Sequence, residues 1–352
     1  MSRFLDARFS SLKPYTPGEQ PRGRSYIKLN TNECPYPPSP KVLEAVNADA
    51  LNDLRLYSDP TARALTDAIA AAYGVGGDQV FAGNGSDEVL AFAFQAFCGE
   101  RGVVMPEISY GFYPVFAELY GICARKIPLR ADFTIDPAQY LMPGENVVIA
   151  NPNAPTGLAL TLDQIEMILR AHPDDVVLID EAYVDFGAES AVKLLDRYDN
   201  LLVVQTFSKS RALAGGRLGF ALGSPALIAD LNTIKFSFHP YNCDRLIQAI
   251  GIASVQDAEY MRACTGRIIA TREMCKAELR DMGCDVTDSL GNFLFVRLPG
   301  FAGGDAYRAL RERGILVRWF DVESIRDWLR ITVGSEEEMQ ILLGTVRDLL
   351  NR

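Results

Sequence analysis

The chain has 352 residues and a formal net charge of −10, with 45 acidic and 35 basic side chains. This length suits one large domain with a smaller one, and the acidic balance argues against nucleic-acid and anionic-membrane partners. The apolar runs are too short to cross a bilayer and no charged-then-apolar leader opens the chain, so we expect a cytoplasmic protein. An anionic ligand must then be held by a local cluster of donors.

Cysteine and histidine usage narrows the possible chemistry. The seven cysteines form no C-x-x-C pair, and their odd number indicates reduced, mostly buried thiols rather than a disulfide framework or a zinc site. The only two histidines are His172 and His239, and neither lies in a motif for a catalytic triad or a metal site. Because His172 precedes Pro173 at an expected helix end, we expect it at the surface, and His239-Pro240 indicates a turn.

From residue 40 to about 240, helical and strand patterns alternate. Asp59-Pro60 predicts the start of a helix that ends at Gly74. Short β-rich runs separated by helical stretches indicate buried strands of a mostly parallel sheet, and hence an α/β fold. The expected strands are Gln79–Ala82, Gly102–Met105, Asn146–Ala150, Asp175–Ile179, Leu201–Thr206 and Leu218–Leu222, and the helices between them include Ser86–Phe97 and Thr161–Ala171.

The pattern changes after Asn242, where one long helical region is expected to reach Met282. Shorter elements follow, at Asn292–Arg297, Asp305–Arg313, Ile315–Arg318, Leu329–Val333 and a closing helix from Ser335. We therefore expect three parts: an N-terminal arm (1–45) that packs with the small domain, a large α/β domain (46–243), and a small α+β domain (244–352).

In open parallel sheets, ligands bind beyond the carboxyl ends of the strands, and the first polar cluster lies at such an end. Gly83–Glu88 follows a strand and opens a helix. Its glycines permit close backbone approach, and Ser86 and Asp87 lie where the free N–H groups of a helix start bind phosphate. It is not a Walker A loop, and Glu88 occupies the third glycine of G-x-G-x-x-G, which weighs against a nicotinamide dehydrogenase. An ordinary N-cap is the alternative.

Two further clusters end the next central strands. Asn151–Gly157 contains two prolines and a glycine, which fix a rigid loop carrying Asn153 and Thr156, either as a plain turn or as part of a pre-organised site. Asp180 follows a strand that should be buried, where a carboxylate is costly unless something positive meets it. A protonated pyridine nitrogen would be such a partner, with Tyr183 close by. A helix cap or a lone salt bridge would explain Asp180 equally well.

The fourth cluster, Thr206–Gly219, places Lys209 between Ser208 and Ser210, with Arg217 eight residues further on. A lysine that forms a Schiff base must be uncharged, and nearby positive charge and partial burial lower its pKa. Arg217 would supply that charge and a fork for phosphate. Most lysines are solvated surface groups, but the setting of this loop weighs against that interpretation.

A fifth candidate is Arg330, which lies inside the strand-like Leu329–Val333 and before Gly334. A long cation among apolar neighbours is either part of a structural ion pair or a ligand anchor. A bidentate arginine is well suited to bind a carboxylate or a phosphate.

Taken together, in this order and over nearly the whole chain, these residues resemble the fold-type I aminotransferases that depend on pyridoxal 5′-phosphate (PLP). The closest resemblance is to their histidinol-phosphate branch. Leu12–Gly18 resembles the N-terminal arm of that branch, and Leu29–Tyr36 its LNxNExPY segment. The resemblance implies PLP as the cofactor. It also implies that Lys209 holds PLP as a Schiff base and then acts as the general base.

The resemblance implies a role for each matching residue. Asp180 would face the pyridine nitrogen, Tyr183 the 3′-oxygen, and Tyr110 would stack on the ring. The residues implied for the cofactor phosphate are Gly85, Ser86, Asp87, Ser208 and Arg217, with Tyr57 reaching it from the partner subunit of a homodimer. The residues implied for the substrate pocket are Tyr15, Asn32 and Arg330. The superfamily often has asparagine where this chain has Ala154, so we expect Asn153 to substitute or Tyr183 to act without it.

The implied reaction transfers the amino group of L-histidinol phosphate to 2-oxoglutarate, giving imidazole acetol phosphate and glutamate in histidine biosynthesis. Arg330 would meet a phosphate in one half-reaction and a carboxylate in the other. Threonine-phosphate decarboxylase and a broad aromatic aminotransferase share the same cofactor and similar motifs, and remain alternatives. A non-catalytic PLP-fold binding protein is a third alternative, and the presence of both Lys209 and Asp180 argues against it.

Overall fold

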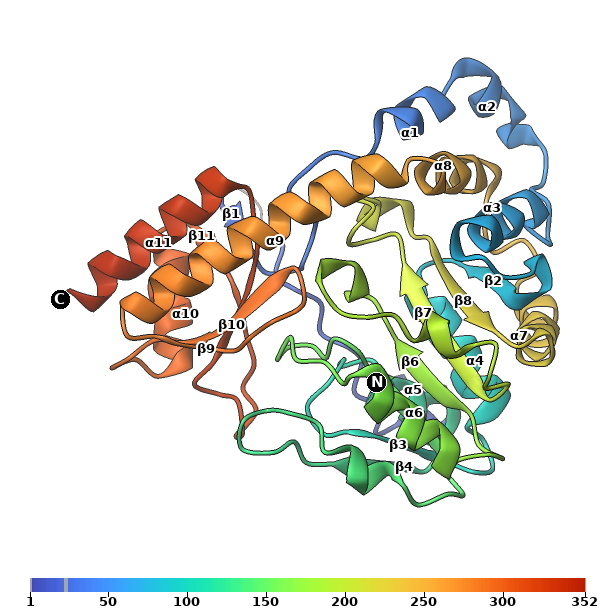
Figure 1. Ribbon diagram of the computed structural model, residues 1–352, viewed down its shortest axis with the longest axis horizontal. Coiled ribbons are helices and arrows are strands. Elements are labelled where there is room, and N and C mark those ends of the chain that lie inside the picture. The colour runs from blue at the N-terminus through green and yellow to red at the C-terminus, as the bar shows by residue number, and fades with distance from the viewer. Residues whose placement is uncertain (1, 22–24, 352) are drawn as a thin grey trace.

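The computed structural model describes residues 2–21 and 25–351. Its largest sheet has seven strands in the order β2-β8-β7-β6-β5-β3-β4 (Figure 1). Strand β8 runs antiparallel to both of its neighbours and the other adjacent pairs are parallel, so the predicted mostly parallel sheet is confirmed. The strands are β2 (Val80–Gly83), β3 (Val103–Pro106), β4 (Ala124–Ile127), β5 (Asn146–Ala150), β6 (Val177–Asp180), β7 (Leu201–Thr206) and β8 (Gly219–Gly223).

Helices cover both faces of this sheet (Figure 1). All residues of six of the strands are buried, which explains their nearly continuous apolar sequences. The exception is β4, a partly exposed edge strand with a polar sequence that we did not predict. One face packs against α3 (Arg63–Tyr73), α6 (Leu162–Ala171) and α8 (Arg245–Val255), and the other against α4 (Ser86–Phe97), α5 (Tyr113–Tyr120) and α7 (Pro225–Phe238).

The ends of these helices follow local capping chemistry. Helix α3 begins at Arg63, later than expected from Asp59-Pro60, because the Asp59 carboxylate accepts hydrogen bonds from the N–H groups of Thr61 and Arg63. It ends, as predicted, at Gly74 in the left-handed conformation (φ 70°). Short 3-10 helices connect other elements: η1 (Ala7–Phe9), η2 (Asp53–Arg55), η3 (Gly77–Gln79), η4 (Pro137–Tyr140), η5 (Val184–Phe186), η6 (Ala191–Leu194) and η7 (Ala214–Gly216).

A second, antiparallel sheet of four strands has the order β12-β13-β10-β9. It consists of β9 (Asp285–Val286), β10 (Phe293–Arg297), β12 (Arg318–Trp319) and β13 (Leu329–Thr332), and it packs with α9 (Ala258–Asp281), α10 (Gly303–Glu312) and α11 (Glu336–Leu350). Helices α9 and α11 lie side by side, and α9 runs from the seven-stranded sheet to the four-stranded one (Figure 1). No helix in the described ranges has the length and apolar character needed to cross a bilayer.

Two expected elements of this C-terminal part are divided in the structure. The segment expected as one strand forms β11 (Ile315–Leu316), which pairs with β1 (Ile27–Lys28), and β12, which pairs with β13. The expected long helical region is broken between α8 and α9, where the carboxylate of Asp257 accepts a hydrogen bond from the Ser39 hydroxyl. Long-range pairing therefore overrides the local pattern in both places.

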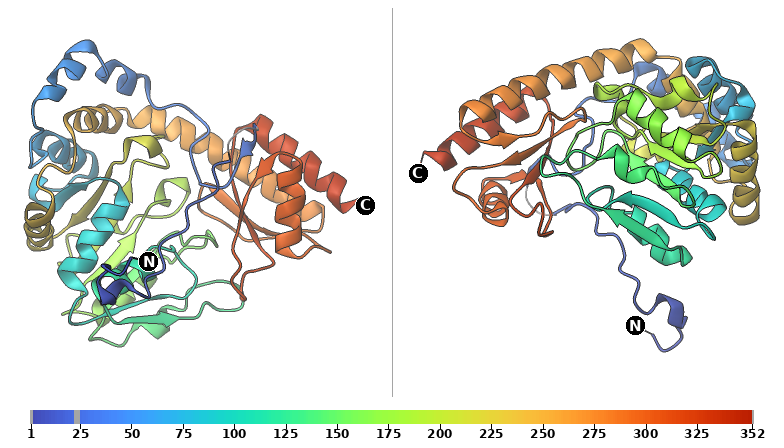
Figure 2. Two further views of the ribbon diagram at one scale, coloured as in Figure 1. Left: turned by 180° about the vertical axis from the view of Figure 1, so that it is seen from behind. Right: turned by 60° about the horizontal axis from the view of Figure 1, so that its bottom comes forward.

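The N-terminal segment contributes to both parts of the molecule. Residues 2–8 are exposed, and this part of the chain projects away from the rest in the right-hand view of Figure 2. After β1 the chain forms α1 (Pro40–Ala45) and α2 (Ala48–Asn52), and Val42 of α1 packs in the core of the seven-stranded sheet. Ile247 and Val255 of α8 lie in the same core, whereas Leu279 of α9 lies in the core of the four-stranded sheet. The chain therefore passes from the core of the seven-stranded sheet to the core of the four-stranded sheet along α9. The domain boundaries expected at residues 45 and 243 stay a prediction.

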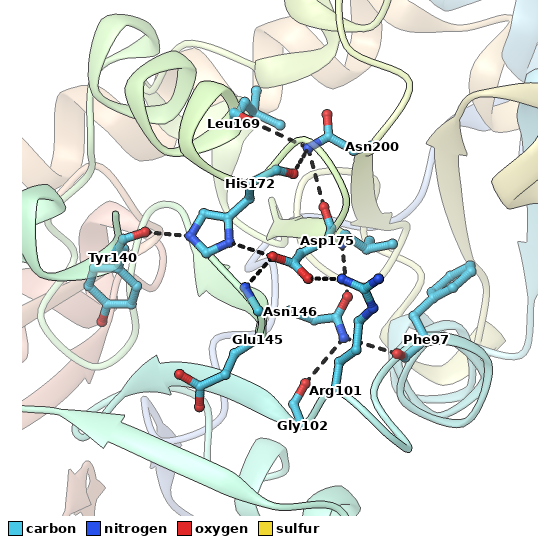
Figure 3. A network of polar contacts seen from close by, with 12 residues as sticks. Phe97, Arg101, Gly102, Tyr140, Glu145, Asn146, Leu169, His172, Asp175 and Asn200 are labelled. Atoms are coloured by element: carbon cyan, nitrogen blue, oxygen red, sulfur yellow. Dashed lines mark hydrogen bonds and ion pairs between the residues drawn. The ribbon is translucent and has the colours of Figure 1, made fainter. Parts of the chain in front are cut away.

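The prediction that His172 lies at the surface is wrong (Figure 3). Its ring is fully buried, with Nδ1 3.1 Å from the Asp175 carboxylate and Nε2 2.6 Å from the carbonyl oxygen of Tyr140. The Asp175 carboxylate also accepts hydrogen bonds from Arg101 and from the N–H of Gly144. The turn from α6 into β6 is covered by η4, so the end of this helix is interior. All seven cysteines are unpaired and five of them are buried, as predicted.

Candidate active site

A cavity of about 240 Å³ lies at the carboxyl ends of β5, β6 and β7, and β13 and the N-terminal segment complete its wall. The strand ends bring the sequence clusters together because parallel strands share this edge of the sheet. Of the predicted site residues, the cavity is lined by Tyr15, Ser86, Asp87, Tyr110, Asp180, Tyr183, Ser208, Lys209, Arg217 and Arg330.

Lys209 lies in the loop after β7. Its Nζ donates a hydrogen bond to the carbonyl oxygen of Thr31 (3.1 Å) and lies 5.8 Å from the centre of the Tyr183 ring. Burial, and next the charge of Arg330, lower the pKa of Lys209 to about 8. The sequence predicts this charge effect for Arg217, but the contribution of Arg217 to the lowered pKa is smaller than that of Arg330. A larger share of the amine is therefore uncharged near neutral pH than in a solvated lysine.

Asp180 ends β6 and is only 5% exposed. Its Oδ2 accepts a hydrogen bond from the Tyr113 hydroxyl (2.7 Å) and its Oδ1 from the N–H of Ala182 (3.1 Å). Burial raises the pKa of Asp180 to about 6 in spite of both hydrogen bonds. In the described part of the chain no lysine or arginine forms an ion pair with it. A buried carboxylate without a cation suits the protonated nitrogen of a pyridine ring.

The start of α4 and Arg217 lie together on one side of the cavity, where they could hold an anion. No side chain caps α4, so its first N–H groups are open to a ligand. Gly85 has φ 81°, and a Cβ there would lie 2.6 Å from the Arg217 guanidinium. Arg217 lies 3.2 Å from the Asp87 carboxylate and 3.5 Å from the Ser208 hydroxyl, and the Tyr110 hydroxyl donates to Asp87 (2.6 Å). These donors suit a phosphate group.

Arg330 of β13 provides a second place in the same cavity that could hold an anion. Its Nη2 donates to the carbonyl oxygen of Asn30 (3.1 Å), but its buried Nε has no hydrogen-bond partner. Among the described residues it forms no ion pair with a carboxylate, and burial lowers its pKa. Arg318 lies beside it and donates to the carbonyl oxygens of Thr16 and Pro17, which holds the N-terminal arm over the cavity. The unpaired donor favours an anionic substrate group.

The other predicted residues lie at or beyond the edge of this site. Asn32 is buried and donates to the Tyr183 hydroxyl (2.9 Å). Asn153 is not brought into the cavity, because its amide donates to the carbonyl oxygen of Ile108 (2.9 Å) and accepts from Ser109 (2.7 Å). Ala154 lines the cavity at this point. Tyr57 is 79% exposed and also lies outside the cavity.

Thr31, Arg318 and Tyr113 make contacts that shape the site, and none of them was assigned a role from the sequence. Thr31 acts through its backbone carbonyl, which leaves no side-chain signal. Arg318 lies in a segment expected to be a strand and was given no role. An arginine among apolar residues is the signal that identified Arg330, and the same signal could have identified Arg318. Tyr113 lies three positions after Tyr110 and starts a helix, and its contact with Asp180 depends on the packing of α5 on the sheet.

The chain matches the sequence model of the aminotransferase class I and II family over residues 24–346. It therefore belongs to this family, and the expected enzyme class, a PLP-dependent aminotransferase, is confirmed.

The most informative relatives share its full length. The chain is 52% identical to histidinol-phosphate aminotransferase 2 of Gluconobacter oxydans, covering 100% of this chain and 99% of that one. It is also 52% identical to histidinol-phosphate aminotransferase 1 of Bordetella parapertussis, with 100% of both chains covered. The solved structure of the Sinorhizobium meliloti histidinol-phosphate aminotransferase in complex with pyridoxal 5′-phosphate superposes with a TM-score of 0.87 at 23% identity, over 99% of both chains. The predicted fold type is confirmed.

Proposed function

We propose that the protein transfers the amino group of L-histidinol phosphate to 2-oxoglutarate, giving imidazole acetol phosphate and glutamate in histidine biosynthesis. The observation that carries this proposal is a lysine amine of lowered pKa in one cavity with two separate anion sites. One anion site suits the phosphate of PLP and the other, at Arg330, the phosphate of the amino donor. The names of relatives that are 52% identical over the full length support the same substrate.

The residues present fit PLP. Asp180 would hold the ring nitrogen, Tyr110 would pack on the ring, and the start of α4 would hold the phosphate with Ser208 and Arg217. When bound, PLP accepts electrons from the substrate carbon that loses its proton.

Three side chains of the protein have separate roles in the proposed reaction. Nζ of Lys209 takes the proton from the substrate carbon and returns it, and a pKa of about 8 suits an amine that must work as a base near neutral pH. Arg330 binds the phosphate of the donor and later a carboxylate of the acceptor. The arm, held by Arg318, covers the cavity and limits the access of water.

We further propose a cytoplasmic homodimer in which Tyr57 reaches the cofactor phosphate of the partner subunit. Tyr57 stacks on Tyr241, with 4.6 Å between ring centroids, and both rings are exposed in the single chain. Large apolar side chains are also exposed just before Tyr57 and at the end of α7, at Leu51, Leu54, Leu56, Phe236 and Phe238. Such a surface favours burial against another protein. The Arg217 side chain is 46% exposed, which leaves the phosphate site open to a group from outside the chain.

The first test mixes the purified PLP-loaded protein with L-histidinol phosphate alone and follows the absorbance of the cofactor. We expect conversion of the cofactor to its amine form without release of CO₂, and reversal on addition of 2-oxoglutarate. The variant Lys209→Ala should lose both the absorbance of the lysine-bound cofactor and turnover. The exposed Lys193 provides the comparison variant Lys193→Ala, which should behave like the wild type.

Other outcomes of this test would assign a different substrate or reaction to the protein. Release of CO₂ from threonine phosphate would make the protein a decarboxylase. Amine exchange with aromatic amino acids that L-histidinol phosphate barely competes for would make it a broad aromatic aminotransferase. Normal turnover by Lys209→Ala would contradict the mechanism.

A further inference from the structure

Tyr113 is the first residue of α5 and lies behind the cavity, against Asp180. Its hydroxyl donates to Oδ2 of Asp180 at 2.7 Å, and the tyrosine side chain is fully buried. The ring is stacked on Phe94 of α4, with 6.3 Å between centroids, and lies edge-on to Tyr110 at 5.6 Å. The packing therefore fixes the position of the hydroxyl.

The hydrogen bond from Tyr113 is the only one that Oδ2 of Asp180 receives within the described ranges. The other donor to the carboxylate, the N–H of Ala182, reaches Oδ1. The titratable groups that face Asp180 offer no compensation. Asp87 on α4 raises the pKa of Asp180, and Tyr183 and Tyr110 are neutral phenols nearby. Without Tyr113, one oxygen of a buried carboxylate would have no donor, which is costly.

We propose that Tyr113 is a positioning residue of the transamination, whose hydroxyl keeps the Asp180 carboxylate ionised and fixed in orientation so that the cofactor ring nitrogen stays protonated. This role rests on the proposed function. The hydrogen bond opposes the effect of burial on the pKa of Asp180. The pKa of Tyr113 itself is raised well above 10.0 by burial and by Asp180, so it remains a donor over the whole working range.

The test uses Tyr113→Phe, which removes one oxygen and leaves the ring packing in place. Tyr140→Phe is the matched control, because Tyr140 is 1% exposed and its hydroxyl has no hydrogen-bond partner. Figure 3 shows that Tyr140 contacts the His172 network through its backbone carbonyl. Both variants thus lose a buried hydroxyl oxygen, and only one of them loses a bond to Asp180.

The first measurement is the free energy of unfolding of the ligand-free protein against pH. The pKa of Asp180 lies near 6 in the folded state, above its ordinary value of 3.8. Its contribution therefore lowers stability as the pH rises between these values, and it is constant above them. Tyr113→Phe should raise the folded-state pKa further and extend this loss above about pH 6. Its destabilisation should grow from about pH 5.5 to about pH 8, while that of Tyr140→Phe stays constant.

The second measurement follows the ring nitrogen of ¹⁵N-labelled PLP in the loaded protein. The nitrogen should lose its proton at lower pH in Tyr113→Phe than in the wild type or Tyr140→Phe. In turnover, kcat should fall about tenfold with KM within about twofold, and Tyr113→Phe should add little in an Asp180→Asn background.

A pH-independent destabilisation together with an unchanged ¹⁵N titration would overturn the role of Tyr113. Neither measurement needs a substrate. If the wild type fails to use L-histidinol phosphate, the proposed function fails while the role of Tyr113 is still decided.

Discussion

Lys209 and Arg330 are two cations that face the same cavity, and the charge of Arg330 makes a charge on Lys209 less favourable. For Lys209 this repulsion is useful, because only the uncharged amine reacts with a carbonyl group. Under the proposed function, Arg330 would both bind the substrate anion and lower the pKa of the base. The sequence suggested Arg217 for the second task, since sequence distance does not reveal which cation lies nearer to the amine.

The pH dependence of cofactor attachment tests this coupling. The rate at which the apoprotein binds PLP covalently, measured by trapping with borohydride, should rise with pH through a midpoint near about 8, where Lys209 loses its proton. Because the charge of Arg330 lowers the pKa of Lys209, Arg330→Gln should move this midpoint to higher pH. Arg308→Gln, which changes an exposed arginine paired with Asp305, should leave it in place. Equal midpoints in all three proteins would refute the coupling.

Among the helices and strands, those with two buried faces could be predicted well. β5 and β7 have the bounds expected from the sequence, since continuous apolar runs report burial on both sides. β4 could not be predicted, because Arg125 and Lys126 belong to an edge strand and resemble a loop. The division between β11 and β12 depends on partners far away in the chain, which local sequence does not specify.

The sequence predicted part of the candidate site as well, namely the residues that directly follow the buried parallel strands. Residues that follow parallel strands share one edge of the sheet, so Asp180 and Lys209 could be placed together from their positions in the chain. The sequence could not predict contacts made by backbone atoms, such as the carbonyl of Thr31. It also could not predict the direction of a side chain in a rigid loop, such as that of Asn153. His172 shows the same limit, because its burial depends on η4 folding over the end of α6.

The start of α4 provides a prediction at the scale of this element. Gly85 and Gly74 both have a positive φ, at 81° and 70°, but a Cβ at Gly74 would meet nothing within 4 Å. Gly74 is in the left-handed helical region (ψ 30°), where alanine costs about 1 kcal/mol, whereas Gly85 (ψ 162°) is in a region that essentially only glycine adopts, so Gly85→Ala should be the more destabilising change. Only Gly85→Ala should displace Arg217 and weaken phosphate binding to the apoprotein, by about tenfold in Kd. Calorimetric titration with inorganic phosphate would measure this, and equal affinities would show that the glycine does not shape the site.

On the scale of the whole molecule, the cavity is assembled from nearly the entire chain. Its lining runs from Tyr15 in the arm to Arg330 in β13. It includes Ser86, which follows the edge strand β2, and Asp180, which ends the central strand β6. The proposed contribution of Tyr57 would extend this assembly to two chains.

Mixing two defective variants tests the contribution across the interface. Lys209→Ala should be inactive, and Tyr57→Phe should bind PLP weakly. In a mixed dimer, one site would combine an intact Lys209 with an intact Tyr57 from the other chain. At limiting PLP, randomly mixed dimers should recover about a quarter of the wild-type sites. Activity no higher than that of the diluted Tyr57→Phe protein would show that Tyr57 acts within its own chain or has no role at the site.

The position of Arg330 bears on whether selection for a stable fold could retain this residue. Its side chain lies 5.6 Å from the rings of Phe293 and Phe320, where an apolar residue would pack without the cost of shielding a charge. Selection for a stable fold alone would not retain an arginine there. Under the proposed function, keeping Arg330 at this position would be a trade-off between activity and stability. Each substrate that carries a phosphate or carboxylate would then, under the same proposal, stabilise the fold as a bound ligand.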